Sequence, residues 1–121
     1  MKFLWTTILV DNMEESLDFY ENITGLKLAD RFKSGQGMEI SFLGEGETKI
    51  ELICNENIKN LNSGNRVTLG FKVESLDEML DFIKDNGIKI ITGPVQPNPN
   101  IKYFIIQDPN GVKIQFAEQI A

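Results

Sequence analysis

Two stretches, VDNMEESLDFY (10–20) and VESLDEMLDFI (73–83), decide the fold, because they are copies of each other at an offset of 63 residues, the difference between positions 73 and 10. Further matches follow in the same order along the chain: GLKL (25–28) with GIKI (87–90), and KIEL (49–52) with KIQF (113–116). Ordered matches over both halves predict two copies of one supersecondary unit. Two copies are too few for a solenoid and favour a pseudo-twofold domain.

Each copy is predicted to hold a strand followed by a helix. FLWTTILV (3–10) and RVTLGFKV (66–73) have the β-branched and aromatic composition of strands. Each helix is expected to begin at a capping box, in which a polar N-cap residue precedes a glutamate by three positions. These pairs are Asn12 with Glu15 and Ser75 with Glu78. The helices are expected to stop near Gly25 and Gly87. Phe19 and Phe82 are expected to widen the apolar stripe that each helix packs against its sheet.

Three further strands follow each helix. They are LKLADRF, MEISFL and TKIELIC in the first copy, and IKII, KYFII and VKIQFAE in the second. Turn-forming segments separate them, namely SGQG, GEGE, PVQPNPN and DPNG. We therefore predict an α+β fold of two βαβββ modules within one domain, residues 1–121. Module 1 spans about 1–55, a polar linker about 55–65 and module 2 about 66–121. We place both modules in one domain because units of this size seldom fold alone.

Composition excludes several kinds of function. The 121 residues carry 12 Lys and Arg against 18 Asp and Glu, and this formal charge of −6 disfavours nucleic acid, which requires clustered cations. One Cys cannot form an internal disulfide, which fits a cytoplasmic protein. The apolar N-terminal run reaches Asp11 too soon for a membrane span, so we expect no membrane partner. The absence of His removes the commonest general base and transition-metal ligand.

Strand alternation assigns two faces to each sheet. The apolar rows, such as Ile50, Leu52 and Cys54, are expected beneath the helices. The opposite rows are Trp5, Thr7, Leu9, Lys49, Glu51 and Ile53 in the first copy, and Thr68, Gly70, Lys72, Lys113, Gln115 and Ala117 in the second. A face with both Trp5 and Glu51 suits a ligand cavity. The alternatives are a solvated face with one stray Trp, or a dimer contact, and the register of the middle strands stays open.

Three stretches, LVDNMEESLDFYENITGLKL (9–28), KIELIC (49–54) and DPNGVKIQFAE (108–118), resemble the vicinal oxygen chelate superfamily, which includes glyoxalase I, bleomycin-resistance proteins and extradiol dioxygenases. With the repeat around them, they extend the resemblance over essentially the whole chain. The resemblance implies that the two modules form an incomplete, mostly antiparallel barrel around a cavity for a divalent metal or an organic ligand. It also implies a homodimer.

The family's four metal positions match Trp5, Glu51, Thr68 and Gln115 of this chain. Metal-bearing members of the family have His or Gln at the first position, Glu at the second, His at the third and Glu at the fourth. Only Glu51 keeps a competent ligand here, because an indole, a hydroxyl and an amide are poor ligands for zinc or nickel. The sequence therefore predicts no metal and no other cofactor.

We expect a metal-free small-molecule-binding protein of the glyoxalase and bleomycin-resistance type, sequestering an aromatic or cationic compound such as an antibiotic. Its ligand-binding residues would be Trp5, Thr7, Glu51, Thr68 and Gln115. The alternative is a glyoxalase-like lyase or isomerase, or another metal-independent enzyme, with Glu51 as acid or base. Three lysines could assist Glu51 or simply pair with it: Lys49, Lys72 and Lys113. A third hypothesis is an interaction module whose sheet face is covered by a partner chain.

Overall fold

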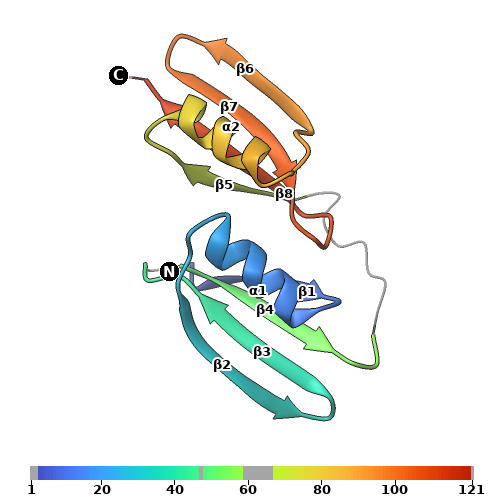
Figure 1. Cartoon of the computed structure of the whole chain (residues 1–121). Coiled ribbons are helices and arrows are strands. Elements are labelled where there is room, and N and C mark those ends of the chain that lie inside the picture. The colour runs from blue at the N-terminus through green and yellow to red at the C-terminus, as the bar shows by residue number, and fades with distance from the viewer. Residues whose placement is uncertain (1–2, 47, 59–66, 121) are drawn as a thin grey trace. The chain divides into compact units, whose positions relative to one another are not determined.

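The computed structural model describes residues 3–46, 48–58 and 67–120 of the chain (Figure 1). The chain divides into two compact units, Met1–Ser63 and Gly64–Ala121. Within the described residues, each unit contains one open four-stranded sheet and one helix, in the element order βαβββ. The α+β fold of two βαβββ modules is therefore confirmed.

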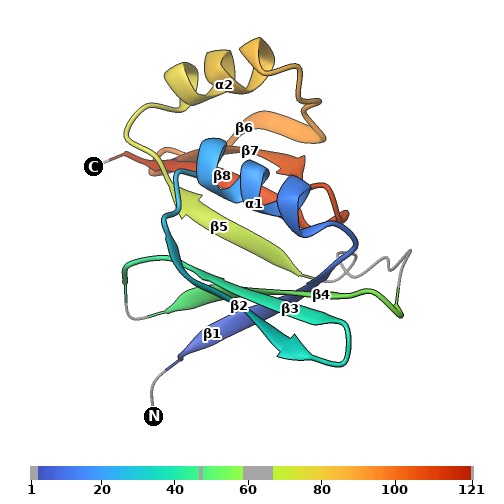
Figure 2. The ribbon, with the colours of Figure 1, turned by 60° about the horizontal axis from the view of Figure 1, so that its bottom comes forward.

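The first unit is built around a mixed sheet. Its elements are β1 (Trp5–Val10), α1 (Met13–Asn22), β2 (Leu28–Gly35), β3 (Met38–Leu43) and β4 (Lys49–Asn55). The strand order is β1-β4-β3-β2, with β1 parallel to β4 and the other neighbours antiparallel. Helix α1 packs on one face of this sheet, against β4, as Figure 2 shows from a second direction. Tyr20, Leu43 and Leu52 are fully buried in this unit.

The second unit repeats this plan. Its elements are β5 (Thr68–Lys72), α2 (Leu76–Asp85), β6 (Thr92–Asn98), β7 (Ile101–Gln107) and β8 (Lys113–Gln119). The strand order is β5-β8-β7-β6, with β5 parallel to β8, and α2 packs against β8. Phe116 lies at the centre of the core, with its ring centroid 5.5 Å from that of Phe104 and 6.1 Å from that of Phe71.

Both helices begin where the capping boxes predict. The Asn12 side chain accepts a hydrogen bond from the backbone N–H of Glu15 at 2.9 Å, and Ser75 accepts one from Glu78 at 3.2 Å. These bonds satisfy N–H groups that have no partner within the helix. Helix α2 ends before Gly87, which has a φ of +70° that glycine adopts without strain. No helix of the described residues is long and apolar enough to cross a membrane.

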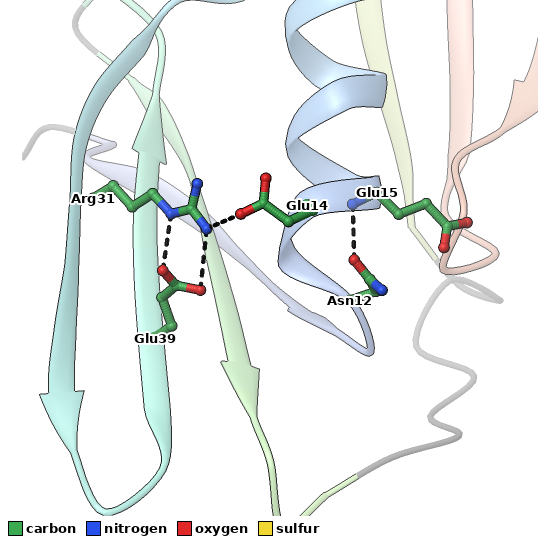
Figure 3. A network of polar contacts seen from close by, with 5 residues as sticks. All are labelled: Asn12, Glu14, Glu15, Arg31 and Glu39. Atoms are coloured by element: carbon green, nitrogen blue, oxygen red, sulfur yellow. Dashed lines mark hydrogen bonds and ion pairs between the residues drawn. The ribbon is translucent and has the colours of Figure 1, made fainter.

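A polar network ties α1 to its sheet (Figure 3). Arg31 on β2 donates to Glu39 on β3 through Nε at 2.8 Å and through Nη2 at 3.4 Å. The same Nη2 also contacts the carboxylate of Glu14 on α1. The hydrogen bonds from Arg31 to Glu39 and then to Glu14 raise the pKa of the guanidinium above its ordinary value. Arg31 is therefore charged throughout the accessible pH range.

Three predictions in the second unit are wrong. IKII (88–91) is not a strand, and β6 runs instead through most of the proline-rich segment predicted to be a loop. The reason is that β6 is an edge strand, whose outer side requires no partner, so Pro94 and Pro97 are tolerated; its pairing with β7 also has register shifts. Phe82 does not join the buried stripe of α2 but is 40% exposed.

The predicted linker, residues 55–65, falls mostly outside the described residues, which stop at 58 and resume at 67. Its first part is structured. Asn55 ends β4, and its carbonyl accepts a hydrogen bond from the N–H of Ile58 at 3.0 Å. This bond closes a turn directly after the strand.

Candidate active site

The face of the first sheet opposite α1 holds the retained carboxylate. Strand register places Thr7 on β1 beside Glu51 on β4, and Glu51 beside Phe42 on β3. The next row along the strands is Leu9, Ile53 and Ile40. Glu51 therefore lies on an inner strand, with a hydroxyl on one side, an aromatic ring on the other and apolar side chains in the adjacent row.

Glu51 is oriented by a hydrogen bond. The Thr7 hydroxyl donates to Glu51 Oε1 at 2.6 Å, a short distance typical of a bond to an ionised carboxylate. Lys49, two positions before Glu51, donates instead to the Gly46 carbonyl at 3.3 Å. No ion pair to Glu51 is found among the residues that the structure describes. The carboxylate is therefore held in position without being neutralised by a lysine.

Aromatic rings border this carboxylate. Trp5, which precedes Thr7 on the same face of β1, is 47% exposed, and its ring meets that of Phe42 edge-on at a centroid distance of 5.6 Å. Phe42 in turn stacks with Phe32 of β2 at 6.5 Å. The sequence indicated Trp5 but not the two phenylalanines, because the register of β3 was open. The Leu43–Ile50 pair, which closes the hairpin, places Phe42 beside Glu51.

The second unit holds the other two candidate residues on the corresponding face of its own sheet. Thr68 on β5 is exposed and pairs with Lys113 of β8. Gln115 is half-buried in the next row, between Gly70 of β5 and Ile105 of β7. The structure thus groups Trp5, Thr7 and Glu51 in the first unit, and places Thr68 and Gln115 in neighbouring rows of the second.

These side chains do not match the needs of a catalytic metal. In the described part of the chain, no three His, Cys, Asp or Glu residues come close enough together to hold an ion. The whole sequence has no His, and one oxygen of Glu51 already accepts from Thr7. A catalytic zinc site takes about three protein ligands, so one carboxylate beside an indole does not fit.

The fold and the retained carboxylate define a broad class of proteins. The model of the Glyoxalase/Bleomycin resistance protein/Dioxygenase superfamily matches residues 2–116, and the chain belongs to this superfamily. The resemblance noted in the sequence is therefore confirmed. The solved structure of glyoxalase I from Leishmania major shares the fold with a TM-score of 0.82 at 20% identity, over 98% of this chain and 86% of that one.

Two curated relatives have the same name. The lactoylglutathione lyase of Neisseria meningitidis is 31% identical over 98% of this chain and 91% of its own length. The lactoylglutathione lyase of Salmonella typhimurium is 29% identical over 98% of this chain and 93% of its own length. These relatives support a glyoxalase-like lyase.

The expected metal-free binding protein, with its role in sequestering an antibiotic, is therefore wrong as the principal interpretation. Nearly full-length relatives at 28–31% identity are named lactoylglutathione lyase, which favours the alternative, a glyoxalase-like enzyme. Loss of the metal ligands does not by itself mean loss of catalysis. Carboxylates act as general acids and bases without a metal, and Glu51 is a carboxylate.

Proposed function

We propose that this chain is a glyoxalase-like lyase or isomerase in which Glu51 transfers a proton between neighbouring carbons of a small carbonyl compound. The observation that carries the proposal is the carboxylate of Glu51, held by the Thr7 hydroxyl at 2.6 Å on an open sheet face. The nearly full-length relatives named lactoylglutathione lyase support this class of reaction.

The name of these relatives suggests the chemistry to test. Lactoylglutathione is the thioester of a 2-hydroxy acid, and its isomer is the hemithioacetal of a thiol with a 2-oxoaldehyde. To convert the hemithioacetal, a base removes the proton from C1, and the released electron pair forms an enediolate with C2. The same proton returns to C2, the C1 hydroxyl proton ends on the C2 oxygen, and C1 becomes the thioester carbonyl. Atoms and electrons balance without an oxidant.

The residues around Glu51 suit the role of base. The hydrogen bond from Thr7 fixes one carboxylate oxygen, which leaves the other to face a substrate. Trp5 and Phe42 supply apolar walls that displace water from the reacting carbon. Trp5 remains a proposed substrate-binding residue through stacking. The other proposed substrate-binding residues, through hydrogen bonds, are Thr7, Thr68 and Gln115.

The test is thioester formation from the preformed hemithioacetal of methylglyoxal and glutathione, measured for the purified chain before and after dialysis against a chelator. We expect Glu51→Gln to lower kcat/KM by about a hundredfold or more, in line with loss of a general base. The matched control is Glu39→Gln, which changes a carboxylate on the helix-covered face of the same sheet. An inactive wild type, or a fully active Glu51→Gln variant, would contradict the proposal.

We also propose that the chain acts in the cytoplasm as a homodimer. The single cysteine, Cys54, supports a reducing compartment, and the resemblance to the superfamily supports the dimer. Light scattering should then give twice the chain mass of 13.7 kDa. A monomeric mass across the concentration range used for the assay would refute the dimer and leave the assignment of Glu51 standing.

A further inference from the structure

The open face of the first sheet continues past Glu51 into a pocket of about 180 Å³, termed here the Ile53 pocket. Its lining residues are Leu9, Val10, Met38, Ile53, Asn55 and Ile58. Ile53 follows Glu51 by two positions on β4, and its partner Leu9 follows Thr7 by two on β1. Two strand residues span about 7 Å, so the pocket lies within the length of one small substituent from the carboxylate.

The pocket is apolar in character. Among the described residues that line it there is no Lys, Arg, Asp or Glu, and the polar side chain of Asn55 already accepts a hydrogen bond from the Asn57 N–H at 3.0 Å. Leu9 and Ile58 are 40% and 45% exposed. Covering exposed apolar side chains with an apolar group removes them from water and lowers the free energy of the system. The pocket therefore favours a hydrocarbon substituent.

The size and construction of the pocket suit one small group. An apolar protein cavity of roughly 150 Å³ is known to hold benzene, so about 180 Å³ accommodates a phenyl or a branched alkyl group. The turn after β4 places Ile58 at the pocket, because the Ile58 N–H donates to the Asn55 carbonyl at 3.0 Å. The pocket is therefore built by β4, which carries Glu51, by the turn that ends this strand, and by residues of the neighbouring strands β1 and β3.

We propose that the Ile53 pocket binds an apolar substituent of the substrate, so that the chain prefers 2-oxoaldehyde adducts carrying a phenyl group over those carrying a methyl group. The preference between the two adducts rests on the proposed function, which concerns the reacting end of the substrate. The binding of an apolar group to the pocket does not rest on it. The charged ends of a peptide thiol would find no ionic partner among the described residues of this pocket, and burying them there would be costly.

The first experiment tests binding without turnover, using benzyl alcohol as the probe. Methyl NMR signals of Leu9, Ile53 and Ile58 should shift and saturate as it is added. The Ile58→Asp variant should weaken this binding by about tenfold, the effect of losing a small apolar contact. The control is Leu28→Asp, because Leu28 has a similar exposure to Ile58 but pairs with Leu43, which is buried on the helix-covered side of the sheet. The Leu28→Asp variant should bind benzyl alcohol as the wild type does.

The second experiment measures the ratio of kcat/KM for the glutathione adducts of phenylglyoxal and methylglyoxal. The ratio should exceed one in the wild type and in Leu28→Asp, and fall about tenfold in Ile58→Asp. Unshifted pocket methyls, or a ratio that Ile58→Asp leaves unchanged, would overturn the inference and leave the lyase intact. Saturable binding at these methyls with neither adduct converted would instead refute the lyase and keep the pocket as a site for apolar groups.

Discussion

Replacing Arg31 by methionine removes a charge that joins two strands and a helix while keeping much of the length of its side chain. Arg31 makes two bonds to Glu39, at 2.8 and 3.4 Å, and the two side chains are 32% and 24% exposed. Its second partner, Glu14, is 77% exposed. The two ion pairs therefore differ in solvent screening, although both involve the same guanidinium.

This difference sets the expected magnitudes. Exposed ion pairs contribute about 0.2–1 kcal/mol to the free energy of unfolding, and a two-bond, half-buried arginine–carboxylate pair belongs at or slightly above the upper end. We expect a coupling energy of about 1 kcal/mol between Arg31 and Glu39, and about 0.3 kcal/mol between Arg31 and Glu14. The loss in Arg31→Met should be about 1–2 kcal/mol, since two carboxylates also lose their partner.

The pH dependence has a definite sign. Glu39 and Glu14 raise the pKa of Arg31 in the folded state. The contribution of Arg31 to the free energy of unfolding is therefore fully present below its unfolded-state pKa. It is lost only as the pH rises through the still higher folded-state pKa. Arginine titrates above about pH 12 even when unperturbed. The difference between the wild type and Arg31→Met should therefore stay constant from about pH 7 to about pH 10.

The assay is urea unfolding followed by circular dichroism, in two double-mutant cycles that combine Arg31→Met with Glu39→Gln and with Glu14→Gln. High salt should reduce the coupling to Glu14 by a larger fraction than the coupling to Glu39. The proposed lyase activity should not change, because this network lies on the side of the sheet opposite Glu51. A coupling to Glu14 as large as that to Glu39, or a steep loss of the difference between pH 7 and 10, would refute the reasoning.

Two further predictions concern the stability of the modules. Asn12→Ala and Ser75→Ala should each cost about 1 kcal/mol of unfolding free energy, because each leaves an N-terminal helix N–H without its acceptor; denaturant midpoints equal to that of the wild type would contradict this. Phe116→Ala should cost about 3–5 kcal/mol, whereas Phe82→Ala should stay within about 0.5 kcal/mol, because Phe116 is 1% exposed and Phe82 is 40% exposed. Equal thermal shifts for the two phenylalanine variants would count against this account of the core.

Features governed by local contacts could be predicted from the sequence. The capping boxes at Asn12 and Ser75 act within one helical turn, so three-residue spacing was sufficient to locate both helix starts. The faces of β4 and β8 followed from alternation, because residues two apart in a strand share a face. This is why Glu51 and Gln115 could be placed on the correct face without knowledge of the neighbouring strands.

Features governed by pairing between strands could not be predicted. β3 carries apolar residues on both of its faces, so its pattern does not select one register, and the rings of Phe42 and Phe32 beside the site were missed. The edge position of β6 is a property of the sheet, and proline content alone wrongly indicated a loop. Phe82 was assigned to the core from spacing, but a short helix on a four-stranded sheet covers only a narrow stripe, and its ring lies outside that stripe.

The two copies of the repeat have diverged at the positions that carry chemistry. Thr7 lies beside Glu51 on parallel strands, and the equivalent neighbours in the second unit are Gly70 and Gln115. Gly70 has no hydroxyl and Gln115 has no ionisable group, so the second sheet cannot reproduce the oriented carboxylate. Under the proposed function, proton transfer would therefore fall to Glu51 in the first unit, and the side chains of Thr68 and Gln115 in the second would supply hydrogen bonds only.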